Sequence, residues 1–174
     1  AHPGAPIDVR AGGDDERLAR PGQGRPGGDP DVDVPESRFQ EYDLELTEAS
    51  TVLDGLIHIR EEIDGTLALR CSCRSAICGS CAMRINGHAC LACNTRVTDA
   101  LPADGGPIVV EPAGNMDVIK DLVVDFAPFW SKVMAVEPWL QPDGPEPEAE
   151  YIAPNEDMLH LAGVMSCIMC GACV

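Results

Sequence analysis

Four cysteines lie close together near the middle of the chain, spaced as C-x4-C-x2-C-x11-C: Cys73, Cys78, Cys81 and Cys93. Thiolates are the soft ligands that tetrahedral iron prefers, and each iron of a [2Fe–2S] cluster takes two of them in addition to the bridging sulfides. The spacing is that of plant-type [2Fe–2S] sites. The sequence therefore predicts a complete binuclear iron–sulfur site, whose chemistry is the transfer of single electrons.

A second cysteine block lies at the end of the chain. Cys167, Cys170 and Cys173 follow the pattern C-x2-C-x2-C, which begins the bacterial run that holds [4Fe–4S] clusters. Such a cluster needs four ligands, and the chain stops at Val174, one residue after the third cysteine. We expect a [4Fe–4S] site whose fourth ligand is missing, in a chain that is truncated at its C-terminal side.

Zinc is the alternative metal for the first block, since C-x-x-C pairs also hold tetrahedral Zn²⁺. Zinc motifs usually combine one close pair of cysteines with another, whereas here a loop with three cysteines is joined by one distant cysteine. The spacing favours iron and sulfur over a zinc-stapled structural module. Cys71 and Cys90 lie outside this ligand set, and we expect both to be small, partly buried hydrophobic side chains.

The composition excludes several classes of protein. A net charge of −17 disfavours nucleic-acid binding, because phosphate contacts are made by clustered Lys and Arg. No stretch reaches the roughly 18 apolar residues of a membrane-spanning helix. Clustered C-x-x-C pairs without a signal-peptide pattern indicate reduced thiols that ligate metal. We find no credible flavin fingerprint, and we predict no catalytic residue in this chain.

Residues 1–30 are rich in Gly, Pro, Asp and Arg and hold few large apolar side chains, so we expect a disordered tail. A G-x-G-x-x-G match at residues 22–27 is not preceded by an apolar strand, and Pro26 prevents the helix that a dinucleotide site requires. We therefore reject the match as a nucleotide site.

A domain with several strands is predicted for residues 31–112. The capping pair Thr51 and Asp54 starts a helix that Asp64-Gly65 ends, and Asn86-Gly87 suits a type I′ hairpin turn. In the cysteine loop, Gly79 is the residue best suited to a positive φ. The expected strands, which alternate or are short apolar runs, cover residues 39–46, 67–69, 81–85, 88–93 and 108–110.

A helical region is predicted for residues 113–174. Apolar residues recur at intervals of three and four over residues 116–134 and predict an amphipathic helix that Pro128 kinks or breaks. Residues 141–150 form an acidic, Pro-rich loop or linker. Asn155 is expected to cap a last helix, which runs into the second cysteine block.

From about Asp29 to its end, the chain resembles the iron–sulfur subunit of succinate dehydrogenase and fumarate reductase, respiratory complex II. Matching stretches in both cysteine blocks, in the same order along the chain, make the resemblance more specific than either block alone. They cover residues 40–42, 61–66, 72–83, 85–87, 91–93, 118–124 and 167–173.

The resemblance implies an α+β protein, in which a β-grasp [2Fe–2S] ferredoxin-like domain is followed by the start of an all-α helical ferredoxin domain. It also implies electron transfer from an FAD-containing succinate dehydrogenase subunit toward quinone; the alternative is a fumarate reductase subunit working in reverse. The ligands carried over are Cys73, Cys78, Cys81 and Cys93 for [2Fe–2S], and Cys167, Cys170 and Cys173 for [4Fe–4S].

Further partners and the location follow from the same resemblance. The [3Fe–4S] ligands and the contacts with quinone and the membrane-anchor subunits belong to the C-terminal part that is missing here. The expected location is peripheral, on the cytoplasmic side of the bacterial cell membrane. Where the family has an apolar first strand before an Asp-Pro like Asp29-Pro30, this chain has Gly and Pro, so we expect the sheet to lack an edge strand and hypothesise that residues 1–28 are not native coding sequence.

Overall fold

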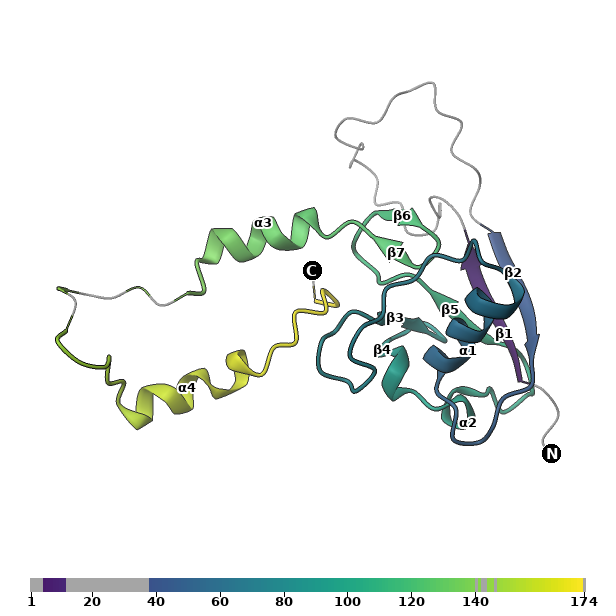
Figure 1. The fold of residues 1–174 in the computed structure, drawn as a ribbon, viewed down its shortest axis with the longest axis horizontal. Helices are drawn as coiled ribbons and strands as arrows, with labels where there is room; N and C mark the ends of the chain where they lie inside the picture. Colours follow the sequence, from purple (N-terminus) through teal and green to yellow (C-terminus); the bar gives the residue numbers. More distant parts are fainter. Residues whose placement is uncertain (1–4, 12–37, 140, 142–143, 146, 174) are drawn as a thin grey trace, which may run out of the picture.

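The computed structural model describes residues 5–11, 38–139, 141, 144–145 and 147–173. Within them a five-stranded mixed sheet has the order β2-β1-β5-β3-β4, and β6 and β7 form a separate pair (Figure 1). The strands are β1 (Ala5–Ala11), β2 (Arg38–Leu44), β3 (Ala82–Ile85), β4 (His88–Leu91), β5 (Ile108–Glu111), β6 (Val118–Lys120) and β7 (Val123–Val124). The helices are α1 (Val52–His58), the π-helix η1 (Ile59–Ile63), the 3₁₀ helix η2 (Ala92–Asn94), α2 (Val97–Ala100), α3 (Ala127–Val136) and α4 (Asn155–Met165).

The expectation of a disordered tail over residues 1–30 is wrong for Ala5–Ala11, which form β1 in the interior of the sheet. This strand pairs antiparallel with β2 and parallel with β5, so the sheet does not lack the strand that we expected to be missing. The Ile7 side chain is fully buried in the main core. The rest of the expected tail, including the match at residues 22–27, lies outside the described residues.

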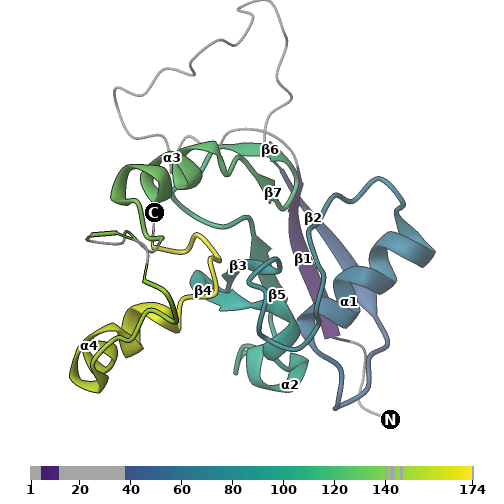
Figure 2. The same ribbon diagram turned by 60° about the vertical axis from the view of Figure 1, so that its left-hand side comes forward.

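Helix α1 packs on the sheet through a close approach at Gly55. A Cβ on this residue would lie 2.8 Å from Ile7 Cδ1, so the missing side chain lets α1 settle against β1 (Figure 2). The predicted capping box is confirmed, since Asp54 N donates to Thr51 Oγ1 and Thr51 N donates to an Asp54 carboxylate oxygen. The helical turns continue through η1 to Asp64, where the predicted end is confirmed.

The hairpin of β3 and β4 is confirmed at the predicted turn. Asn86 has a φ of 50° and Gly87 one of 80°, the two positive values that a type I′ turn requires. The Asn86 side chain also accepts a hydrogen bond from Val109 N and donates one to Ala100 O. The turn is thereby fastened to β5 and to the end of α2, which fixes where the distal arm of the hairpin lies.

Residues 67–69 were expected to form a strand, and this prediction is wrong. The backbone N–H of Ala68 donates to Asp121 Oδ2 at 2.8 Å, and the carbonyl of Ala68 accepts from Leu122 N at 3.2 Å. A carboxylate thus takes the place of a neighbouring strand. Asp121 is 8% exposed and has a φ of 48°, as befits a turn residue turned inward.

The predicted helix over residues 116–134 is correct only from Ala127 onward. Its first half forms β6 and β7, and Asp125 N closes this pair by donating to Asp117 O. Pro128 lies in the first turn of α3, where its missing N–H has no helical partner to lose, so it helps begin the helix rather than kinking it. The apolar spacing is compatible with the predicted single helix and with the observed strands followed by α3. In the observed arrangement, side chains from β7 and α3 enter one small core around Val124 and Phe129.

Helix α3 leads away from the sheet, and α4 brings the chain back, so that the second cysteine block lies beside the loop that precedes β3 (Figures 1 and 2). The prediction that Asn155 caps α4 is wrong, because Pro154 holds the N-cap position and Asn155 is the first helical residue. None of the described helices is long and apolar enough to cross a membrane.

Replacing Ile7 with Ala tests whether β1 belongs to the core. Removing a fully buried side chain should lower the free energy of unfolding by about 2–5 kcal/mol, whereas Ile119→Ala, at a side chain 62% exposed, should change it by about 0.5 kcal/mol or less. Urea unfolding followed by circular dichroism measures both. Equal effects of the two changes would show that β1 does not pack as described.

Candidate iron–sulfur site

The first cysteine block is assembled from two segments that the sheet brings together. Cys73, Cys78 and Cys81 lie on the loop that leads into β3, and Cys93 lies in η2 directly after β4. Ala92 N donates to Cys81 O at 3.1 Å, which joins the end of the loop to the end of the hairpin. The fold therefore brings the distant fourth cysteine back to the other three, as the sequence predicted.

Backbone amides of the loop point at three of the four sulfurs. Ser75 N and Cys78 N lie 3.4 and 3.3 Å from Cys73 Sγ, and Ala76 N lies 3.3 Å from Cys93 Sγ. Cys73 N lies 3.5 Å from Cys78 Sγ. Such N–H donors stabilise negative charge on sulfur, so the loop is built for thiolates rather than for neutral thiols.

The inward-facing amides require an unusual backbone. Gly79 has a φ of 71°, which confirms the expectation from the sequence, but Arg74 and Ala76 also have positive values of 56° and 57°. Positive φ costs free energy in residues that have a Cβ, and such residues cluster where function demands a particular backbone. No sequence signal marked Arg74 or Ala76, because neither type favours this conformation.

The sulfurs differ in their protonation. Hydrogen bonding, first with the Ser80 hydroxyl 3.3 Å away, lowers the pKa of the Cys78 thiol to about 6. Burial raises the pKa of Cys81, which is 4% exposed, to about 11, while the neighbouring Cys93 acts both ways: its backbone hydrogen bond lowers this pKa and its thiol raises it. A metal held here would have to displace the Cys81 proton, which iron does when it binds a thiolate.

A [2Fe–2S] cluster fits this arrangement. The amides directed at Cys73, Cys78 and Cys93 would stabilise a dianionic cluster with four thiolates. Among the described residues, no three Cys, His, Asp or Glu side chains gather around one point closely enough for a single metal ion. A binuclear cluster spreads its four ligands over two irons, so the amide pattern is the relevant test of fit.

The second cysteine block packs against the first, which the sequence did not indicate. A Cβ on Gly79 would lie 2.7 Å from Ile168 O and 2.9 Å from Cys170 Cα, so the loop and the second block touch where Gly79 has no side chain. Gly171 is buried, and a Cβ there would lie 2.9 Å from Met116 Cε and 3.1 Å from the Phe126 ring. Glycine at both positions permits this close contact.

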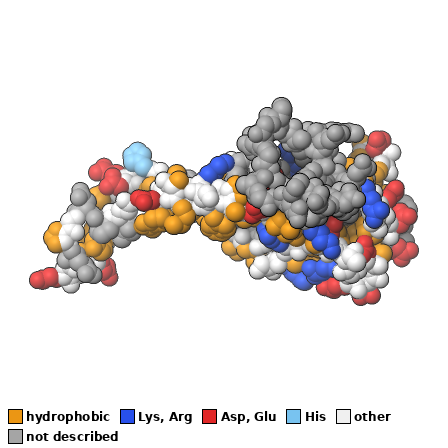
Figure 3. Space-filling model, turned by 90° about the horizontal axis from the view of Figure 1, so that it is seen from above, with side chains coloured by type: hydrophobic (Ala, Val, Ile, Leu, Met, Phe, Trp, Pro, Cys, Tyr) orange, Lys and Arg blue, Asp and Glu red, His pale blue; other side chains and the backbone are white. Residues whose placement is uncertain are grey.

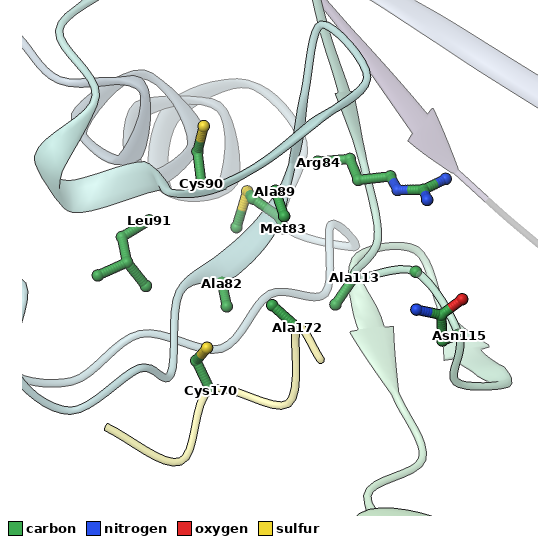
Figure 4. A pocket seen from close by; sticks show the side chains of 11 residues that line it. Ala82, Met83, Arg84, Ala89, Cys90, Leu91, Ala113, Asn115, Cys170 and Ala172 are labelled. Atoms are coloured by element: carbon green, nitrogen blue, oxygen red, sulfur yellow. The ribbon is translucent and has the colours of Figure 1, made fainter. Parts of the chain in front are cut away.

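The two leftover cysteines behave as expected. Cys71 and Cys90 are half-buried and pack against the main core. Cys90 also lines a cavity of about 140 Å³ between the β3–β4 hairpin and the second block, where Cys170 and Ala172 face Ala82 (Figure 4). The cavity belongs to the junction of the two cysteine blocks.

Residues 28–131 match the family described as the 2Fe-2S iron-sulfur cluster binding domain. The match covers more than half of the chain, and the chain belongs to this family. Its cofactor is thus the [2Fe–2S] cluster that the first cysteine block predicts.

Similar proteins place the chain more narrowly within that family. The fumarate reductase iron-sulfur subunit of Mycobacterium tuberculosis is 44% identical over 137 residues, which are 78% of this chain and 54% of the relative. The mitochondrial succinate dehydrogenase [ubiquinone] iron-sulfur subunit of Dictyostelium discoideum is 39% identical over 139 residues, 78% of this chain and 48% of the relative. The chain spans about half the length of these relatives, and the predicted resemblance is confirmed.

The fold has a counterpart among solved structures. A chain of the Mycobacterium smegmatis Sdh1 complex in the apo form matches with a TM-score of 0.76 over 99% of this chain and 63% of its own, at 24% identity. The match shows the same fold and confirms the α+β class with its β-grasp ferredoxin-like domain.

The pKa values predict how the cluster-free chain is alkylated. At pH 7 iodoacetamide should modify Cys78 before Cys81, with midpoints near pH 6 and pH 11. Ser80→Ala should move the Cys78 midpoint upward. Peptide mass spectrometry across a pH series measures this, and earlier labelling of Cys81 would contradict the geometry.

The same pKa values set the sign of two contributions to stability. Folding favours the Cys78 thiolate, a contribution present above the ordinary pKa of 9.0 and lost as the pH falls through about 6. Folding favours the neutral Cys81 thiol, a contribution present below pH 9.0 and lost as the pH rises through about 11.

Gly79→Ala tests the contact between the two blocks, with Gly87→Ala as the matched control. Both glycines have positive φ, so both changes should cost about 1–2 kcal/mol of stability. Only Gly79 faces neighbouring backbone, and its replacement should cost roughly 1–3 kcal/mol more, whereas nothing lies within 4 Å of a Cβ at Gly87. Equal losses in urea unfolding would argue against the contact.

Proposed function

We propose that this chain is the cluster-bearing part of an iron–sulfur subunit that carries electrons between an FAD-containing dehydrogenase subunit and quinone. The observation that carries the proposal is the packing of the two cysteine blocks on each other at Gly79 and Cys170. Electron relays need their carriers close together. A shuttle protein with a single cluster would have no use for the second block or for the arm that returns it.

The proposed ligands follow the two blocks. Cys73, Cys78, Cys81 and Cys93 hold the [2Fe–2S] cluster, which supplies a one-electron carrier. Three ligands of a [4Fe–4S] cluster are Cys167, Cys170 and Cys173. Met169 N lies 3.4 Å from Cys167 Sγ, so an amide faces a sulfur in this block too.

The charge distribution supports an anionic cofactor in the first block. Although the chain carries a net charge of −17, residues 65–98 contain no Asp or Glu and four arginines, Arg70, Arg74, Arg84 and Arg96. Asp or Glu beside the cysteines would oppose thiolates and a negatively charged cluster, and this segment of the sequence contains neither.

The names of the relatives support the proposed partners. These relatives are subunits of fumarate reductase and of succinate dehydrogenase [ubiquinone]. We propose contacts with a flavoprotein subunit, and contacts with membrane-anchor subunits and quinone through further residues of the whole protein. The proposed location is peripheral, on the cytoplasmic side of the bacterial cell membrane.

Electron flow in the opposite direction is the second candidate, because the relative with 44% identity is a fumarate reductase subunit. The same residues would then carry electrons from quinone toward fumarate. The direction depends on cluster potentials and on the quinone, and both candidates use the same two cysteine blocks.

Anaerobic reconstitution with iron and sulfide tests the proposal. The chain should gain the visible absorption of a [2Fe–2S] site and, after reduction by dithionite, an EPR signal of a single unpaired electron. Cys78→Ser should abolish or strongly alter both signals, whereas Cys90→Ser, outside the ligand set, should leave them intact. A colourless chain that holds stoichiometric zinc would refute the proposal.

A further inference from the structure

Residues 68–70 are fastened to residues 121–124 by three hydrogen bonds, immediately before the cluster-binding loop begins. Ala68 exchanges bonds with Asp121 and Leu122, and the third bond runs from Arg70 Nη1 to Val124 O at 2.9 Å. The first two bonds use the backbone of Ala68, which any residue could supply. The third depends on the arginine side chain alone.

The Arg70 guanidinium makes a second contact at the same place. Its Cζ lies 5.3 Å from the centroid of the Phe126 ring, within the range of a cation–π interaction. A planar guanidinium can donate to the Val124 carbonyl while it stacks on a ring, whereas a lysine ammonium has no such plane. Arg70 therefore fixes both the position and the orientation of Phe126.

Phe126 in turn supports the second cysteine block. Its ring lies where a Cβ on Gly171 would come within 3.1 Å, and it meets Phe129 edge to face at 5.7 Å. The other side of the block lies on Gly79 of the cluster-binding loop. The second block is thus held between the loop and the Phe126 ring.

We propose that Arg70 is a positioning residue: by holding Phe126 against Gly171, it keeps the second cysteine block on the cluster-binding loop. Arg70 lies three residues before Cys73. The same side chain therefore fastens the start of the cluster-binding loop and positions the second cysteine block. The role in electron transfer rests on the proposed function. The packing role does not, because it concerns contacts within the cluster-free chain.

Hydrogen exchange of the cluster-free full chain, kept reduced, tests the packing role. Arg70→Met keeps the aliphatic stem and removes the guanidinium, and Phe126→Leu removes the ring. Both changes should speed exchange in residues 167–173 by about tenfold. Arg60→Met, at an arginine paired with Glu61 elsewhere on the surface, should exchange as the unchanged chain does.

Peptides from α1 report whether a variant is folded. If Arg70→Met speeds exchange there as well, Arg70→Lys, which keeps the charge and loses the planar guanidinium, decides the matter: it should still speed exchange in residues 167–173 with α1 protected, and unchanged exchange there would overturn the proposal. Unchanged exchange in residues 167–173 for Arg70→Met and Phe126→Leu, with α1 protected, would overturn the proposal. Equally fast exchange in Arg60→Met would overturn the specific role of Arg70.

The reduction potential of the reconstituted [2Fe–2S] chain gives a second measurement. Phe126→Leu changes no charge, and loosening the second block should admit water to the loop around Gly79. Water favours the more highly charged reduced form, so the potential should shift upward. No upward shift would overturn the link to electron transfer. A chain that forms no cluster would refute the proposed function, while the exchange data would still decide the packing role.

Discussion

The orientation of a few backbone amides is the constraint on which the site depends. Cys73, Ser75, Ala76 and Cys78 turn their N–H groups toward cysteine sulfurs, and positive φ at Arg74 and Ala76 is part of that turn. A loop with such a backbone does not hold itself in place. Asp121 and Arg70 fasten its beginning, β3 continues from its end, and Asn86 fixes the hairpin that returns Cys93.

Local signals in the sequence predicted the local structure well. The capping pair Thr51 and Asp54 and the turn at Asn86-Gly87 each act over a few residues, and both are confirmed. Long-range contacts were not predictable in this way. β1 is a short strand among Gly and Pro residues, and its stability comes from β2 and β5, which are distant in sequence. The contact of Gly79 with Cys170 is also long-range, and it left no pattern to recognise.

The arm formed by α3 and α4 leaves many of its large apolar side chains exposed, whereas the sheet domain buries most of its own. Helix α4 buries none of its residues, and large hydrophobic side chains lie exposed along the arm (Figure 3). The exposed side chains include Trp130, Met134, Leu159, Val164 and Met165. The arm is therefore held mainly at its C-terminal end, where the second cysteine block contacts Gly79 and Phe126. Helix α4, which leads into the block, contributes little.

The central position of β1 determines when the domain can form as the chain is made. Ile7 pairs with Ile108, about a hundred residues later, and β1 separates β2 from the rest of the sheet. The sheet therefore closes only after β5 has been synthesised, and all four cysteines of the first block precede β5. Until β1 and β5 meet, these four thiols belong to a chain whose sheet is incomplete, and they must stay reduced and unpaired if they are to bind metal.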